Sequence, residues 1–160
     1  MSLRTLSVVA AGAVYLQLVL GALMRHTGAG LAIPDFPLAF GRLVPPFDSP
    51  AVVTHFAHRM GALLVACCVG VAAGRVLQRH RDEPALARPA ALLVGLVCVQ
   101  ILLGGVTVWT RKAVVPATLH VLTGALVLAT SAVLALRSHR LVVAPQRATF
   151  EVLSTPRVAT

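Results

Sequence analysis

Two histidines, His58 and His120, are the residues of this chain whose type and position point most directly to chemistry. Each lies inside a long apolar segment, His58 seven residues after Ala51 and His120 four residues after Pro116. At the helical rise of 1.5 Å per residue, these offsets correspond to depths of ~10 Å and ~6 Å. An ionisable side chain is costly inside a membrane, so a functional role is the first expectation for both histidines.

Imidazole is a common axial ligand of haem iron, and a helix bundle provides the flat apolar slot that a porphyrin needs. Two histidines at similar depth on parallel helices face one another across such a bundle. The pair therefore predicts a bound haem b whose iron is ligated by His58 and His120. The alternative interpretation is that each imidazole only hydrogen-bonds a neighbouring helix, and the spacing leaves both open.

Arginines accompany the histidines. Arg59 follows His58 directly, and Arg25 and Arg111 end two apolar segments on the same side. Haem propionates are anionic and arginine binds carboxylates bidentately, so these three arginines are candidate cofactor-binding residues. Interfacial anchoring explains Arg25 and Arg111 equally well, whereas Arg59 lies deeper.

His55 precedes His58 by three residues, so the two side chains share one helix face. Imidazole moves protons and binds iron, which makes His55 a candidate proton carrier or alternative ligand. A histidine at the level of the lipid headgroups is the other interpretation.

The elements that position these residues are four apolar segments. Hydrophobic residues make up 58% of the chain and charged residues 12%, against roughly 25% charged residues in soluble domains. Each segment is long enough to cross a ~30 Å hydrocarbon core as a helix. The segments are residues 6–24, 51–77, 90–110 and 116–136. The sequence thus predicts an all-α membrane protein with an antiparallel four-helix transmembrane bundle in residues 1–140 and a cytoplasmic tail of little structure in 141–160.

An internal similarity suggests that the bundle is built from two similar helix pairs. Residues 17–21 and 100–104 share a Gln-x-x-x-Gly pattern at an offset of 83, and residues 58–63 resemble 120–126 more loosely. Each pair then carries one histidine on its second helix. Internal repeats of this kind are common in membrane folds.

The charge distribution predicts the orientation. The net charge is +9, but no nucleic-acid recognition motif accompanies it, so nucleic acid is not expected as a partner. Nine arginines fall on the side of the two termini, against five basic residues on the other side. Because basic residues favour the cytoplasm, both termini should be cytoplasmic in a multi-pass protein of the cell (inner) membrane. Residues 25–50 then form an outside loop, whose prolines and apolar side chains predict a lid on the bundle.

Three stretches resemble the haem A synthase family. The first is residues 20–31, Leu-Gly-Ala-Leu-Met-Arg-His-Thr-Gly-Ala-Gly-Leu, followed by Pro-Asp-Phe-Pro-Leu at 34–38 and a glycine at 41. The second is the pair His58-Arg59, and the third is residues 100–110 followed by His120. The resemblance covers most of residues 15–130, and its first stretch is the most specific.

This resemblance carries expectations of its own. Typical members have eight helices in two similar halves, each with a histidine pair, and they oxidise a methyl group of haem O to the formyl group of haem A for terminal oxidases. The chain resembles one half, so a homodimer is expected. Haem O is then the expected substrate, and haem O synthase or terminal oxidase subunits are candidate partners.

Two departures from the family pattern bear on catalysis. Members often carry a glutamate where this chain has His55, which therefore becomes the candidate catalytic residue with a proton-handling role. Many members also have paired loop cysteines, where this chain has Ile33 and Phe40. The alternatives to an enzyme are a b-type haem electron carrier, a haem-handling assembly factor and a haem-free membrane scaffold.

Overall fold

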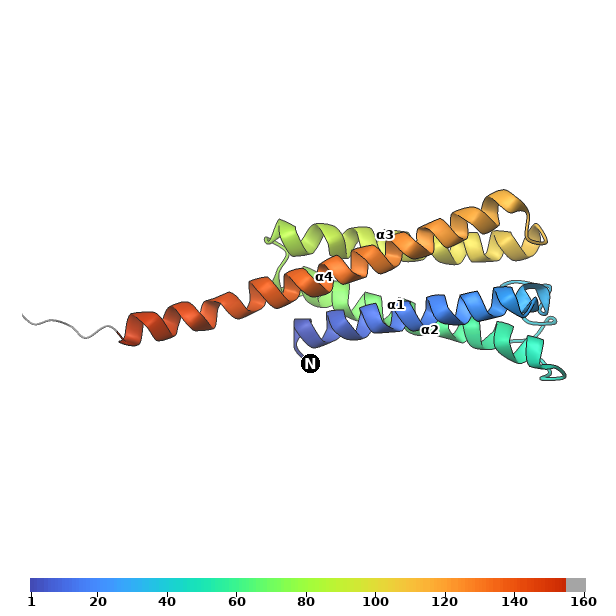
Figure 1. The fold of residues 1–160 in the computed structure, drawn as a ribbon, viewed down its shortest axis with the longest axis horizontal. Helices are drawn as coiled ribbons and strands as arrows, with labels where there is room; N and C mark the ends of the chain where they lie inside the picture. Colours follow the sequence, from blue (N-terminus) through green and yellow to red (C-terminus); the bar gives the residue numbers. More distant parts are fainter. Residues whose placement is uncertain (155–160) are drawn as a thin grey trace, which may run out of the picture.

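Four long helices dominate the computed structural model of this chain (Figure 1). The structure describes the backbone of residues 1–154 and the side chains of residues 1–141, and it contains no named strand in that part. The elements are α1 (Leu3–His26), a short 3-10 helix η1 (Ala29–Leu31), α2 (Pro50–Arg79), α3 (Pro84–Trp109) and α4 (Val114–Ser154).

Each helix begins before the apolar segment that predicted it. Capping residues mark two of these starts. The Ser2 hydroxyl accepts from the N–H of Thr5, and the Ser49 hydroxyl accepts from the N–H of Val52. Proline, which needs no N–H partner there, occupies the first position of α2 and of α3. At the other end of the chain α4 continues as a helix to Ser154, so the prediction of little structure directly after residue 140 is wrong for the backbone of 141–154.

Within residues 1–141, four helices are long and apolar enough to cross a membrane, which confirms the predicted all-α multi-pass bundle. Helix α1 packs against α2 and α4, and α3 packs against α4 and α2. In Figure 1, α1 lies beside α2 and α3 lies beside α4. Helices α2 and α4 therefore run parallel to each other on a diagonal of the bundle.

The tightly packed core occupies only one end of the bundle. Its buried side chains come from the first half of α1 and α3, the second half of α2 and the middle of α4. They include Leu6, Ala10, Val69, Val76, Leu86, Leu93 and Leu134. The two helix pairs diverge towards the opposite end, where residues 27–49 connect α1 to α2 (Figure 1). Both His58 and His120 belong to that second, less tightly packed end.

Candidate functional site

His58 lies against the middle of α1. Gln17 Nε2 donates to Nδ1 of His58 at 3.1 Å and to the backbone carbonyl of the same residue at 2.7 Å. The imidazole edge also fills the space beside Gly21, where a Cβ atom would come within 3.0 Å of His58 Cε1. A glutamine and a glycine one turn apart on α1 thus fix the position of this ring.

His120 has the corresponding surroundings on α3. Its Nδ1 donates to the backbone carbonyl of Gln100 at 3.1 Å, and Gln100 Nε2 lies 3.4 Å from His120 Nε2. A Cβ atom at Gly104 would come within 3.3 Å of His120 Cε1. Because Nδ1 carries the proton, Nε2 of His120 keeps its lone pair, which is the tautomer that a metal requires.

Each glutamine is accommodated by a second glycine. A Cβ atom at Gly61 would clash with the Gln17 amide, and a Cβ atom at Gly124 would lie 3.1 Å from Gln100 Nε2. Each helix pair therefore contains one glutamine, two glycines and one histidine in mutual contact. Sequence reasoning identified both histidines but assigned no role to Gln17 or Gln100, although both open the repeated Gln-x-x-x-Gly pattern.

The residues present fit a haem held between the two histidines. Both imidazoles are only partly buried by the chain, and they project from diagonal helices at similar distances from the helix starts, ~12 Å for His58 in α2 and ~9 Å for His120 in α4. The Oε1 atom of Gln100 is buried without a hydrogen-bond partner. No group of three or more His, Cys, Asp or Glu side chains could hold a metal ion within residues 1–141, whereas a haem iron takes only its axial ligands from the protein.

Arg59 is engaged by the loop. Its Nη1 donates to the carbonyl of Leu38 at 2.7 Å, and its Nη2 donates to the carbonyls of Asp35 at 2.6 Å and Ile33 at 3.3 Å. The guanidinium carbon also lies 5.7 Å from the centre of the Phe36 ring. The structure thus gives Arg59 a loop-holding role, and its predicted contact with a haem propionate stays a prediction. Sequence reasoning could not find these partners because backbone carbonyls carry no sequence signature.

Phe36 joins the loop to the other helix pair. Its ring occupies the space beside Gly105 on α3, where a Cβ atom would lie 2.8 Å from Phe36 Cδ1. It packs edge-on against Trp109 at a centroid distance of 6.0 Å, and Trp109 Nε1 donates to the Phe36 carbonyl at 3.2 Å. The loop is therefore attached to α2 through Arg59 and to α3 through Phe36, as a lid on the bundle requires.

Asp35 shapes the tip of this loop. Its two carboxylate oxygens accept from the N–H groups of Phe40 and Gly41, each at 2.7 Å. Phe40 and Gly41 both have positive φ, 57° and 71°, so the carboxylate stabilises a strained turn. The hydrogen bond from Gly41 is the largest of the effects that hold the pKa of Asp35 below its usual value, with smaller contributions from Phe40 and the Arg59 charge.

His55 is buried under the loop, with 3% of its surface exposed. The N–H of Ile33 donates to its Nδ1 at 3.1 Å, and Ile33 forms a small buried cluster with Ala39 and Val52. His55 and His58 share one side of α2 in sequence, but His55 contacts the loop whereas His58 contacts α1. The structure does not test the predicted proton-handling role of His55.

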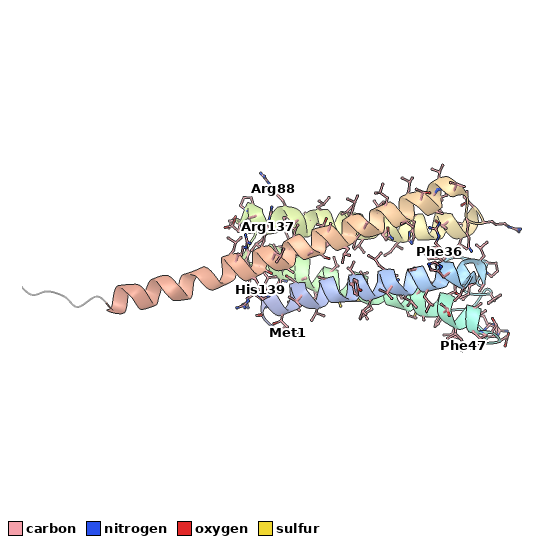
Figure 2. All side chains as sticks on the ribbon, in the orientation of Figure 1. Met1, Phe36, Phe47, Arg88, Arg137 and His139 are labelled. Atoms are coloured by element: carbon pink, nitrogen blue, oxygen red, sulfur yellow. The ribbon has the colours of Figure 1, made fainter. Side chains whose placement is uncertain are left out.

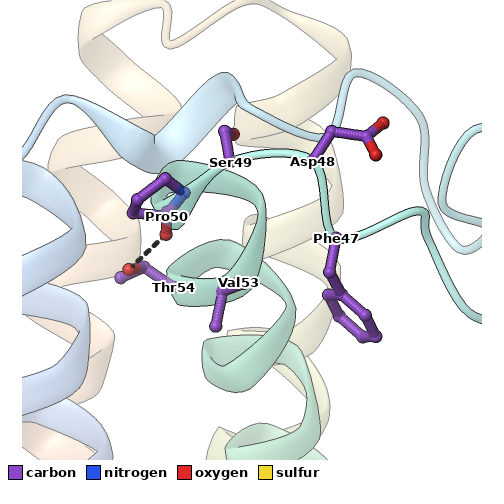
Figure 3. Close-up of a pocket in the computed structure, with 6 residues that line it drawn as sticks. All are labelled: Phe47, Asp48, Ser49, Pro50, Val53 and Thr54. Atoms are coloured by element: carbon purple, nitrogen blue, oxygen red, sulfur yellow. Dashed lines mark hydrogen bonds between the residues drawn. The ribbon is translucent and has the colours of Figure 1, made fainter.

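The remaining predicted cofactor ligands, Arg25 and Arg111, are exposed at the loop end of the bundle, and no side-chain hydrogen bond of either is present among the described residues. Figure 2 shows the side chains of the whole described bundle, including Phe36 at this end. A separate hollow at the start of α2 is lined by Phe47, Asp48, Ser49, Pro50, Val53 and Thr54 (Figure 3). It holds no histidine, so it is not part of the candidate haem site.

Comparison with known proteins agrees with the resemblance seen in the sequence. Residues 1–132 match the model of the family COX15-CtaA, cytochrome oxidase assembly protein. A heme A synthase of Caulobacter sp. (strain K31) is 39% identical over 145 residues, and one of Symbiobacterium thermophilum is 38% identical over 90 residues. A heme A synthase of Staphylococcus carnosus is 29% identical over 108 residues.

These alignments cover 81%, 56% and 68% of this chain, respectively. They cover only 40%, 29% and 34% of the three relatives, so the chain spans well under half the length of the proteins that it matches. The family model nevertheless covers most of the chain, including both histidines, both glutamines and the loop. The chain therefore belongs to the COX15-CtaA family of cytochrome oxidase assembly proteins.

Proposed function

We propose that this chain is a haem A synthase-like membrane enzyme that binds haem between His58 and His120 and oxidises a methyl group of haem O to a formyl group. The observation that carries the proposal is the arrangement of a histidine, a glutamine and two glycines in each helix pair of a member of this family. Conversion of a methyl to a formyl group removes four electrons and adds one oxygen atom, for which molecular oxygen would be the oxidant, with water as the second product. A bound haem would supply the iron centre that such chemistry needs.

The side chains around the histidines would select the ligating nitrogen. His120 donates through Nδ1 to the Gln100 carbonyl, which is the tautomer that would ligate iron through Nε2. The Gln100 amide, which donates to this Nε2 at 3.4 Å, would have to turn away first. Nδ1 of His58 accepts from Gln17, so its ligation through Nε2 requires the Gln17 amide to turn and present its oxygen. This rotation would give up the hydrogen bond from Gln17 Nε2 to the His58 carbonyl.

The loop would exclude water from the reaction. Arg59 and Phe36 hold residues 33–38 across α2 and α3, at the end where the bundle core is open. A closed apolar site strengthens the electrostatic interactions in it and suppresses side reactions. His55, directly beneath this loop, is the residue that we propose to take up or pass on a proton during the oxidation.

Expression of the chain beside a haem O synthase, with chromatography of the extracted pigments, tests the proposal. Haem A should accumulate with the native chain and fall at least about tenfold with His55→Ala, because positioned acid–base groups contribute ~100-fold or more. His26→Ala, at the exposed end of α1, is the matched control and should leave haem A unchanged.

One observation favours a second function. His55 stands where the family often has glutamate, and its Nδ1 is occupied by the Ile33 N–H. A chain that binds haem but accumulates only haem O in the same experiment is a non-catalytic b-type electron carrier or a haem-handling assembly factor. A purified chain without a haem absorption spectrum contradicts both functions.

We also propose that the protein is a homodimer in the cell (inner) membrane, with both termini cytoplasmic. The four described helices provide one histidine pair inside the bundle, and symmetric pairing of two copies is the commonest way to double a site. Native mass spectrometry from mild detergent should give a dimer, and a monomer at all protein concentrations contradicts this assembly. Haem O synthase and terminal oxidase subunits remain the proposed partners.

A further inference from the structure

A shallow hollow of about 340 Å³ lies between the start of α3 and the middle of α4. It is at the opposite end of the bundle from the loop and the histidines, and Figure 2 labels its two arginines, Arg88 and Arg137, at this end. Nothing in the proposed haem chemistry uses this hollow. Its lining combines two cations with an apolar strip.

Arg137 is oriented in the hollow by a backbone carbonyl of α3 that has no partner within its own helix. Pro89 has no N–H, so it cannot donate to the carbonyl of Ala85 four residues earlier. Arg137 Nη1 donates to this carbonyl at 3.0 Å instead. One donor thus orients the guanidinium, and its other N–H groups remain available to a ligand.

The two arginines have no carboxylate partner in the part of the chain whose side chains are described. The one ion pair in that part joins Arg81 to Asp82, and the Glu83 carboxylate accepts from the N–H of Ala85 at the start of α3. The positive charge of Arg88 and Arg137 is therefore not neutralised by these nearby acidic residues. An anionic group is the complementary ligand.

The rest of the lining is apolar and lies further from the helix ends. Leu92 follows Arg88 by one turn of α3, and Val133 and Ala129 precede Arg137 by one and two turns of α4, which places them ~6 to ~12 Å deeper. Leu92 and Val133 are 56% and 39% exposed, so the chain itself does not cover this strip. A ligand that fits must be anionic at the membrane surface and apolar below it.

We infer that the hollow is a binding site for an anionic phospholipid. The headgroup phosphate binds Arg88 and Arg137, and an acyl chain lies along Leu92, Ala129 and Val133. Basic pockets between transmembrane helices are known to suit acidic headgroups. A free phosphate ion would use the arginines but leave the apolar strip without a partner.

Native mass spectrometry of the full chain in detergent, titrated with phosphatidylglycerol or phosphatidylcholine, tests this site. Phosphatidylglycerol should bind more tightly, and Arg88→Gln should weaken its binding about fivefold, the usual effect of one arginine at a membrane surface. Arg79→Gln removes the same charge from the end of α2 outside the hollow and should have no comparable effect. Ala129→Phe keeps the charge but fills the apolar strip, and it should also weaken binding.

Three results would overturn the site. Equal binding of the two lipids would show that the arginines do not select charge. If Arg79→Gln weakened binding as much as Arg88→Gln does, the preference for phosphatidylglycerol would come from the overall charge of the protein. Displacement of the lipid by millimolar inorganic phosphate, with Ala129→Phe unchanged, would leave an anion site without lipid specificity. Because Arg137 also holds the Ala85 carbonyl, Arg88→Gln is the decisive variant if Arg137→Gln fails to fold.

Discussion

A histidine can ligate iron only through a ring nitrogen without a proton, so the hydrogen bonds of His58 and His120 decide which nitrogen is available. His120 meets this requirement through its bond to the Gln100 carbonyl. His58 meets it only after the Gln17 amide turns. The two proposed ligands therefore differ in tautomer, and at each of them a glutamine amide must move before iron can bind Nε2.

Removal of either imidazole should abolish or weaken haem binding. His58→Ala and His120→Ala each delete one axial ligand, so a six-coordinate low-spin spectrum should be lost or reduced in the purified protein. His26→Ala serves as the control because His26 is exposed at the end of α1. An unchanged spectrum in both alanine variants would rule out this ligand pair.

Filling the space beside the rings should have a similar effect without removing a ligand. A Cβ atom at Gly21 or Gly104 already approaches the histidine carbons at 3.0 and 3.3 Å, so Gly21→Leu and Gly104→Leu should displace the rings and lower haem content about tenfold. Gly12→Leu and Gly95→Leu are matched controls on the same helices, since no atom lies within 4 Å of a Cβ there. Equal haem content in all four variants would place the haem elsewhere.

The position of the two histidines within long apolar helices could be predicted from the sequence, because polar side chains in apolar segments are conspicuous. Their partners could not. Gln17 and Gln100 were visible as a repeat, but only the packing of α1 on α2 and of α3 on α4 reveals that they face the imidazoles. The loop carbonyls that Arg59 binds were equally invisible in the sequence.

The loop of residues 27–49 does more than connect α1 to α2, because it is held against the bundle. It is attached at three places: Arg59 on α2, Gly105 with Trp109 on α3, and the buried His55. Its prolines and apolar residues predicted a lid, but the crossing from the first helix pair to α3 depends on a contact between Phe36 and a glycine. Such a contact has no sequence signature, because glycine pairs are common in membrane helices for packing reasons.

Loss of the Arg59 side chain should loosen this loop. Each hydrogen bond from a charged donor contributes ~1.5–3 kcal/mol, so Arg59→Ala should raise amide exchange of residues 33–42 by about tenfold or more. Arg42→Ala, an exposed arginine of the same loop, should have little effect. If exchange is unchanged in Arg59→Ala while haem binding falls, Arg59 binds the cofactor instead of the loop.

The Asp35 turn should make the loop sensitive to acid. The pKa of Asp35 lies below its ordinary value of 3.8, chiefly through the Gly41 N–H, so the stabilising charge is present above that value and is lost as the pH falls through the lowered pKa. Amide exchange of Phe40 and Gly41, corrected for intrinsic rates, should therefore rise only below about pH 4. Asp35→Asn should show raised exchange at neutral pH and no such transition.

At the scale of the whole molecule, the tightly packed core and the candidate haem site lie at opposite ends of the bundle. The tightly packed core fills the end that holds the N-terminus and the turn between α2 and α3. The histidines and the loop occupy the other end. The four helices and their antiparallel order followed from hydropathy and length alone. The position of the tightly packed core did not, because apolar residues facing lipid and apolar residues facing the core are indistinguishable in sequence.

This separation sharpens the orientation prediction. The end with the tightly packed core also carries most of the arginines, among them Arg4, Arg79, Arg88 and Arg137, which favours the cytoplasm for that end. Reporter fusions after Pro46, in the loop, and after Arg140, on α4, should therefore report opposite sides of the membrane, with the loop outside. Both fusions must be shown to be expressed at full length. Reporters on the same side would contradict a bundle in which all four helices cross the membrane, and a loop on the cytoplasmic side would reverse the proposed position of the haem site.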